Sequence, residues 1–249
     1  ESSRTLKKKI RMCLSPIKKS VFRNAASIFA VSDYTARLVM QECGVKPEHI
    51  LSVYNGVDAE EFQPAPRASD LVEKHGLAGR KVLLSLNRLV DYKGVDRAIA
   101  ALGEVALRHP EVIYLICGEG EDRARLESLV RHYRVQDHVV FTGAVPFNRL
   151  KDYYNLADAF VLLSREDLDT PNVEGFGLVF LEAGACEVPC VAGDSGGIPN
   201  AVVNGKTGWL VDPNSVDAIT TALIEALDHS ERSKKLGRQA RARILDSFT

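Results

Sequence analysis

Short apolar runs alternate with amphipathic stretches along most of the chain. The apolar runs are rich in β-branched residues and nearly continuous, which is typical of strands buried on both faces of a parallel sheet. The predicted strands are Ser27–Val31, Ile50–Val53, Lys81–Leu86, Val112–Cys117, His138–Phe141, Ala159–Leu163, Val188–Ala192 and Gly208–Val211. The predicted helices are Asp33–Gln41, Gly94–Arg108, Asp122–Tyr133, Pro146–Ala157, Gly177–Cys186, Ser215–Leu227 and about Ser230–Leu245. This alternation predicts an α/β fold with a Rossmann-like, doubly wound parallel sheet.

A turn followed by a stiff link marks one domain boundary. Asn55-Gly56 is a turn signal, and Phe62-Gln-Pro-Ala-Pro66 is an extended segment. Residues 67–249 hold a complete wound unit of about six strands, whereas residues 1–54 hold only a helix, a strand, a helix and a strand. We therefore expect residues 55–249 to form a domain. We interpret residues 1–54 as the end of a preceding domain together with the link.

Composition excludes several classes of protein. The 249 residues are 45% hydrophobic and 26% charged, which is ordinary for a soluble globular protein. A net charge of −1 leaves no nucleic-acid footprint, and no apolar run reaches the length of a membrane span. Five cysteines without paired spacing indicate reduced thiols and a cytoplasmic location. The chain begins with Glu1 and carries no leader, so we interpret it as a fragment or a processed chain.

Charge is concentrated in residues 1–25, where eight lysines and arginines stand against Glu1 alone. The ordinary interpretation is a solvated helix face. The alternative is a basic patch that meets an anionic membrane surface or a phosphorylated acceptor. On that alternative, the protein would lie peripherally at the inner face of the membrane.

The segment from Glu174 to Glu182 (Glu-Gly-Phe-Gly-Leu-Val-Phe-Leu-Glu) joins a glycine-rich loop to a predicted helix. Such a helix start presents free amides and a positive dipole end to a phosphate. A carboxylate would repel phosphate, so the two glutamates fit better as acceptors for sugar or ribose hydroxyls. Taken alone, the glutamates are more typical of an exposed helix, because glutamate is common on helices.

Two cations follow the strand Lys81–Leu86, at the edge where α/β folds bind ligands. Arg88 can clamp two phosphate oxygens and Lys93 can add a point charge, so together they would neutralise a diphosphate. As isolated residues they are as easily two solvated loop cations.

Three further turns carry weaker signals. Cys117-Gly-Glu-Gly120 would allow a close backbone approach to a ligand, and Asp194-Ser-Gly-Gly-Ile-Pro199 would offer a second nest of amides. Each by itself is equally typical of a tight turn. Asp167-Leu-Asp169 spells a pair that can hold a metal, but we attribute it to chance and predict no metal site.

Together these loops resemble glycosyltransferase family 4, the group 1 glycosyltransferases. The resemblance runs in order over residues 26–249. It rests on Asn55-Gly-Val-Asp58 with Phe62-x-Pro64, Arg88-x4-Lys93-Gly94, Gly118-Glu-Gly120, Val140-Phe-Thr-Gly143, Glu174-Gly-Phe-Gly177 with Glu182, Ser195-Gly-Gly-Ile-Pro199 and Gly205-x-x-Gly208. It implies one half of a GT-B fold, in which residues 55–249 are the C-terminal donor-binding domain and residues 1–54 the end of the N-terminal acceptor domain.

The resemblance also implies roles for individual residues. Arg88 and Lys93 would contact the nucleotide diphosphate, Glu174 the donor sugar and Glu182 the ribose. The backbone of the turn would hold the distal phosphate, and the base would stack near Val140–Val145. The donor-binding set is completed by Gly118, Gly120, Val145, Gly175, Phe176, Gly177 and Leu178.

Enzymes of this family retain anomeric configuration and need no metal or other cofactor in the site. The leaving diphosphate, stabilised by Arg88, Lys93 and the helix dipole, would help to deprotonate the acceptor hydroxyl. The expected donor is a nucleotide-diphospho-sugar of UDP, GDP or ADP type carrying a mannose- or glucose-type hexose. The expected acceptor is a glycan or a lipid-linked glycan.

Two positions depart from the family pattern. Glu187 stands where the family usually has Gly, so we expect a reshaped turn, and Asn200 stands where an acid is common. Because the acceptor domain is largely missing, we expect the chain alone to bind nucleotide and to transfer sugar poorly or not at all. The rival hypotheses are a non-catalytic binding or assembly module of the same fold, and a Rossmann oxidoreductase. The latter is disfavoured because no strand–G-x-G-x-x-G–helix unit is present.

Overall fold

The computed structural model describes residues 16–166, 172–228 and 231–249. Most of the basic residues 1–25, and both Asp167 and Asp169, lie outside these ranges. The chain divides into two compact units, Glu1–Tyr54 and Asn55–Thr249. The acceptor and donor roles assigned to the two segments stay predictions. Within the described ranges, no helix has both the length and the apolar character needed to cross a membrane.

The smaller unit is a βαβ arrangement preceded by a helix over residues 16–23. Strands β1 (Ile28–Ala30) and β2 (Ile50–Ser52) pair in parallel, with α2 (Asp33–Cys43) and a 3-10 turn, η1 (Pro47–His49), between them. A capping box of Ser32 and Thr35 begins α2, and Gly44, with a φ of 66°, ends it. The predicted order of helix, strand, helix and strand is confirmed.

The larger unit is built on a six-stranded parallel sheet in the order β5-β4-β3-β6-β7-β8. The chain starts at β3 in the middle, winds out to β5, and then returns to β6 on the other side of β3. The predicted doubly wound parallel sheet is therefore confirmed. Its strands are β3 (Lys81–Leu86), β4 (Val112–Cys117), β5 (Val139–Gly143), β6 (Ala159–Leu162), β7 (Cys190–Gly193) and β8 (Gly208–Val211). The order reverses between β3 and β6, and at such a switch point the carboxyl edge of an α/β sheet opens a crevice.

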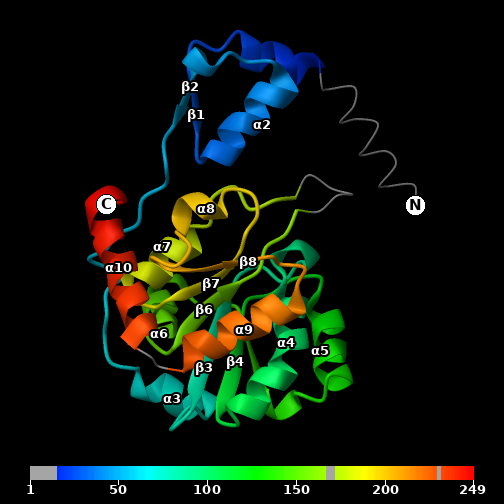
Figure 1. The fold of residues 1–249 in the computed structure, drawn as a ribbon, viewed down its shortest axis with the longest axis vertical. Helices are drawn as coiled ribbons and strands as arrows, with labels where there is room; N and C mark the ends of the chain where they lie inside the picture. Colours follow the sequence, from blue (N-terminus) through cyan, green and yellow to red (C-terminus); the bar gives the residue numbers. More distant parts are fainter. Residues whose placement is uncertain (1–15, 167–171, 229–230) are drawn as a thin grey trace. The chain divides into compact units, whose positions relative to one another are not determined.

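Helices cover both faces of this sheet (Figure 1). They are α3 (Ser69–His75), α4 (Val95–Arg108), α5 (Arg123–His132), α6 (Leu150–Tyr154), α7 (Leu178–Ala185), α8 (Ile198–Ala201), α9 (Val216–Leu227) and α10 (Glu231–Ser247). Neighbouring strand residues point to opposite cores: Leu83 packs with α4, α5 and α9, whereas Leu84 packs with α3, α6, α7 and α10. Burial on both faces explains the nearly continuous apolar strands.

Two helix predictions are wrong in detail. The predicted helix Pro146–Ala157 is a 3-10 turn, η4 (Phe147–Arg149), followed by the five-residue α6. The Asn155 amide still donates to the Lys151 carbonyl at 3.0 Å, but the Leu156 and Ala157 amides donate to carbonyls three residues back, so the α-helical pattern ends there. Helix α3 was not predicted, because its only buried residue is Leu71 and it has no apolar periodicity.

Candidate functional site

The loop after β3 places two cations at the switch point. Arg88 is exposed, and among the described residues none forms a hydrogen bond or an ion pair with its guanidinium. Lys93 ends a 3-10 turn, η2 (Asp91–Lys93), and its side chain is only 15% exposed. Its ammonium lies 2.5 Å from the Glu174 Oε2 atom. The structure therefore brings together two of the three residues predicted to be catalytic and leaves the third free to bind a ligand.

The backbone of Glu174 is fixed by the turn Ser195-Gly-Gly197. The Gly197 amide donates to the Glu174 carbonyl at 2.9 Å. At Gly196, with a φ of 55°, a Cβ atom would overlap that same carbonyl oxygen. The interpretation of this turn as an open nest of amides is wrong for Gly197, because its amide is already used by Glu174.

Helix α7 begins where the sequence predicts, directly after the Glu174-Gly-Phe-Gly177 turn. Gly177 is its N-cap with a φ of 92°, a left-handed conformation that favours glycine, and Leu178 is 43% exposed. Phe176 is buried and contributes its backbone to the turn. The first amides of a helix have no carbonyl partner within it, so this end of α7 can attract an anion.

Glu182 lies in the second turn of α7, as predicted, and its carboxylate accepts a hydrogen bond from the Tyr154 hydroxyl at 2.5 Å. Burial raises the pKa of Glu182, and the Tyr154 hydrogen bond acts in the opposite direction. Burial, and then the nearby Glu182 charge, raise the pKa of Tyr154, so this hydroxyl remains a donor. No sequence pattern indicates Tyr154, because the contact joins two elements, α6 and α7.

Gly118 and Gly120 lie in close backbone contact with the loop after β3. A Cβ atom at Gly118 would overlap the Asn87 carbonyl, and one at Gly120 would overlap the Leu89 carbonyl. The Leu89 amide also donates to the Glu119 carbonyl at 2.9 Å. The close approach is therefore to the neighbouring loop, which carries Arg88, and contact of these glycines with a donor stays a prediction.

The region predicted for the base, Val140–Val145, comprises most of β5 and the two residues after it. Val145 is partly buried and packs against the core on the α6–α7 face, in the connection to η4. On β5 itself, the Arg123 guanidinium lies 4.2 Å from the centroid of the Phe141 ring. Arg123 and Phe141 lie at the carboxyl edge of the sheet, on the side of β4 away from the switch point. Stacking of a base in this region stays a prediction.

Sequence reasoning missed three further residues at this edge. Both polar side-chain atoms of Asn87 and the hydroxyl of Ser164 are buried without a hydrogen-bond partner among the described residues. Arg165, directly after Ser164, pairs with acids on two other elements. Their position just after a buried strand is the sequence signal that could have identified these polar residues. Their partners depend on tertiary contacts, which the sequence does not show.

The thiols and acids provide no separate reactive centre. Cys43, Cys117, Cys186 and Cys190 are free and buried, which confirms reduced thiols for the described cysteines. Burial raises the pKa of Cys117 and of Cys186 to about 12. In the described part of the chain, no three His, Cys, Asp or Glu side chains are grouped so as to hold a metal ion.

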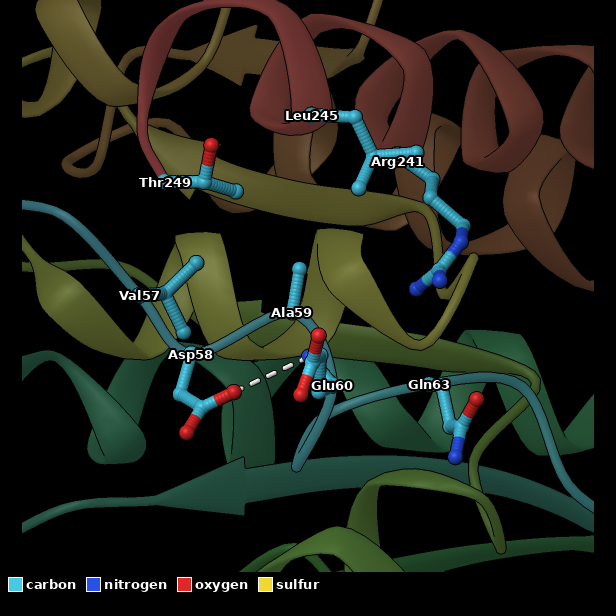
Figure 2. Close-up of a pocket in the computed structure, with 8 residues that line it drawn as sticks. All are labelled: Val57, Asp58, Ala59, Glu60, Gln63, Arg241, Leu245 and Thr249. Atoms are coloured by element: carbon cyan, nitrogen blue, oxygen red, sulfur yellow. Dashed lines mark hydrogen bonds between the residues drawn. The ribbon is translucent and has the colours of Figure 1, made fainter.

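A pocket of about 560 Å³ lies elsewhere, between the segment after Asn55 and the end of α10 (Figure 2). Two of its polar side chains, Asp58 and Arg241, are already engaged. Asp58 accepts the amides of Glu60 and Glu61, and Arg241 donates to the carbonyls of Phe62 and Ala185. None of the predicted donor-binding residues lines it, so we interpret it as a packing seam between this segment and α10.

Comparison with known proteins gives a consistent family. The model for "Glycosyl transferases group 1" matches residues 69–243. The chain is 41% identical over 194 residues to a GDP-mannose-dependent alpha-(1-6)-phosphatidylinositol monomannoside mannosyltransferase of Mycolicibacterium smegmatis. That match covers 78% of this chain and 51% of the relative. The chain thus spans about half the length of the curated relatives it matches.

Solved structures share the fold. HepE of Anabaena, crystallised with UDP and glucose, aligns with a TM-score of 0.84 at 22% identity, over 94% of this chain and 62% of that chain. The C-terminal domain of a glycosyl transferase group 1 family protein from Francisella tularensis aligns with a TM-score of 0.65 at 23% identity. This match covers 78% of this chain and 99% of that domain.

Proposed function

The chain belongs to the group 1 glycosyl transferases, and from that premise we propose that the protein transfers a hexose from a nucleotide-diphospho-sugar with retention of configuration. Residues 55–249 are the donor-binding domain, one half of a GT-B enzyme, and residues 1–54 belong to the acceptor side. The similarity of a whole solved C-terminal domain of this family to the chain supports that division.

The observation that carries the proposal is the assembly at the switch point. Lys93 and Glu174 are in contact, the start of α7 is beside Glu174 in the chain, and Arg88 is unpaired among the described residues. Arg88 and Lys93 bind the diphosphate, Glu174 accepts from the sugar hydroxyls, and Glu182 accepts from the ribose. The two cations and the α7 dipole stabilise the leaving diphosphate, whose oxygens take up the acceptor proton. This chemistry uses no metal ion.

The donor proposed is GDP-mannose. The support is the 41% identity to a relative named as GDP-mannose-dependent, over a match that lies largely within residues 55–249 and therefore within the donor-binding unit. Donors of UDP or ADP type are the alternatives.

By the same comparison, the acceptor proposed is a glycolipid of the phosphatidylinositol mannoside kind. The protein would reach it from the cytoplasmic face of a membrane through the basic residues 1–25.

Calorimetric titration tests the donor site. The 249-residue chain is titrated with GDP, UDP, ADP and their hexose conjugates, with and without EDTA. We expect selective GDP binding that EDTA does not change. Arg88→Ala weakens it about tenfold or more, because a charge-assisted hydrogen bond is lost. Arg108→Ala is the matched control, since Arg108 is also exposed and lies at the far end of α4.

The outcomes separate the alternatives. Binding that falls in Arg88→Ala and in Glu182→Ala but not in Arg108→Ala supports the donor site. Binding of every nucleotide with equal affinity contradicts GDP selectivity, and no binding by the chain contradicts a donor site complete within residues 55–249. Donor binding without sugar transfer in the full-length protein favours a non-catalytic module of the same fold.

A further inference from the structure

Arg165 bridges the two ends of the loop that carries Lys93. Its guanidinium Nη2 atom lies 2.8 Å from Asp91 Oδ1, before Lys93, and its Nη1 atom lies 2.9 Å from Asp96 Oδ1, after Lys93. The side chains of Arg165 and Asp96 are only 14% and 12% exposed. A planar guanidinium can hold two carboxylates at once, which an ammonium cannot do with the same geometry.

Backbone contacts tie the same loop to the end of β6. The Arg165 amide donates to the Tyr92 carbonyl at 2.9 Å. Gly94, with a φ of 73°, has no room for a Cβ atom, because one would overlap the Leu163 carbonyl. The residues on both sides of Lys93 are therefore fixed to the strand across the switch point.

A second cation makes the network continuous. Arg125 on α5 lies 2.9 Å from the same Asp91 oxygen and 2.6 Å from Asp122. Arg125 is 43% exposed, so it is the more solvated of the two cations. Arg165 reaches the loop from the connection after β6, the same connection that carries Glu174, the partner of Lys93.

We propose that Arg165 is a positioning residue that holds the Lys93 ammonium where it can meet the diphosphate of the donor. Arg165 itself does not touch the ligand. A lysine side chain is flexible, so the place of its ammonium depends on the backbone of Tyr92 to Gly94. Arg165 also shares with Arg125 the neutralisation of Asp91 and Asp96, which would otherwise repel a phosphate at this edge. The inference rests on the proposed function, since it takes Lys93 as a diphosphate ligand.

The first test compares GDP with GMP, which lacks the second phosphate. We expect Arg165→Met to weaken GDP binding by about ten- to a hundredfold, the size of effect that a misplaced group produces, and GMP binding much less. Arg165→Lys keeps the charge but cannot bridge both carboxylates. We therefore expect its GDP affinity to lie between those of the wild type and Arg165→Met. The ratio of the GDP and GMP affinities is the readout that a general loss of stability does not move.

The matched control is Arg67→Met. Arg67 pairs at 2.7 Å with Asp158, whose side chain is 14% exposed, and this pair lies just before the amino end of β6. It is a partly buried arginine–aspartate pair at the opposite edge of the sheet, with Arg67 31% exposed. We expect Arg67→Met to lower stability and to leave the ratio of GDP to GMP affinity unchanged. Equal losses of GDP and GMP binding in Arg165→Met would overturn the proposal, because Arg165 would then be merely structural.

Amide hydrogen exchange tests, in the absence of a ligand, whether Arg165 holds the loop that carries Lys93. In Arg165→Met, the amides of residues 90–95 should exchange faster than in the wild type, whereas Arg67→Met should leave them unchanged. Unaltered exchange at residues 90–95 would contradict the positioning role. If the wild type binds no GDP, the proposed function fails, and the exchange experiment still decides whether Arg165 holds the Lys93 loop.

Discussion

The ammonium of Lys93 lies 2.5 Å from a carboxylate oxygen of Glu174, across the switch point of the sheet. Their side chains are 15% and 16% exposed, so the pair is largely withdrawn from water. Each group satisfies the other where a diphosphate and a sugar are proposed to bind. On the proposed function, a donor would enter a site in which the Lys93–Glu174 pair is already formed, and each of these two residues would exchange a protein partner for a ligand partner.

The pair makes a prediction about stability. Lys93→Met should lower the free energy of unfolding by about 1–3 kcal/mol, because it leaves the Glu174 carboxylate partly buried without its cation. Lys93→Met combined with Glu174→Gln should cost less than the sum of the two single changes, since neither partner is then left charged and alone. Urea denaturation of the four proteins gives the coupling. Strictly additive costs would show that the two groups are independent.

Glu182 makes a prediction about pH. Burial raises its pKa above the ordinary range of about 4.3, and the ionised form is the better acceptor for ribose hydroxyls. GDP affinity of the wild type, relative to Glu182→Gln, should therefore increase as pH rises through the raised pKa. Comparing the two proteins at each pH cancels the titration of the phosphate. If the ratio of the wild-type to the Glu182→Gln affinity does not change between pH 4.5 and 7, Glu182 does not contact the bound nucleotide.

The same shift affects stability with a defined sign. A carboxyl whose pKa is higher in the folded state binds protons more readily folded than unfolded. The contribution of Glu182 to the free energy of unfolding therefore falls as pH rises from about 4.3 through the folded value. Tyr154→Phe removes the hydrogen bond that opposes the shift, so it should move this loss to higher pH. Urea denaturation at several pH values measures the free energy of unfolding. Glu182→Gln is the control, because it lacks this titrating group and keeps all the others.

Much of the larger unit could be predicted from the sequence, because its strands are local and apolar. The prediction Lys81–Leu86 matches β3 at both ends, since both faces of that strand are buried and the pattern is continuous. Helix α6 could not be predicted to its true length, because the amides after Asn155 donate to carbonyls three residues back, and the apolar pattern does not show this change. Gly118 could not be assigned either, because what it approaches is the backbone of another loop.

The site was predictable only in its parts. Arg88, Lys93 and Glu174 stand out because each follows a strand or precedes a helix at the carboxyl edge. Tyr154 and Arg165 do not, because their partners Glu182 and Asp96 are 28 and 69 positions away in the chain. Their importance arises from packing, which a single sequence does not reveal.

The buried thiols make a prediction about reactivity. Burial raises the pKa of Cys117 and Cys186 to about 12, and that of Cys190 also rises, so the reactive thiolates are scarce near neutral pH. We expect these three cysteines to resist iodoacetamide at pH 8 in the folded protein and to react completely in urea. Peptide mass spectrometry locates the modified sites. Rapid native alkylation of Cys190 would contradict its place in the core.

The turn after α7 makes the last prediction, at the position where Glu187 replaces a glycine of the family pattern. The expectation of a reshaped turn is wrong. Glu187 adopts a left-handed φ of 59°, and the amides of Glu187 and Val188 donate to the carbonyls of Gly184 and Ala183 at 2.9 and 3.0 Å. These are the two hydrogen bonds of a Schellman motif, which normally takes glycine at this position. The hydrogen bonds compensate for a conformation that costs a non-glycine residue about 1–2 kcal/mol.

Glu187→Gly should therefore stabilise the chain by about 1 kcal/mol in urea denaturation, because glycine adopts this conformation without strain. Glu187→Ala is the control. It also removes a negative charge that opposes the helix dipole, but it keeps the strain, so its gain should be the smaller one. The difference between the two variants measures the backbone strain less the extra conformational entropy that glycine gives the unfolded chain. Equal stability of the glycine and alanine variants would contradict the strain. The charge of Glu187, and not its backbone conformation, would then be what lowers the stability of this turn.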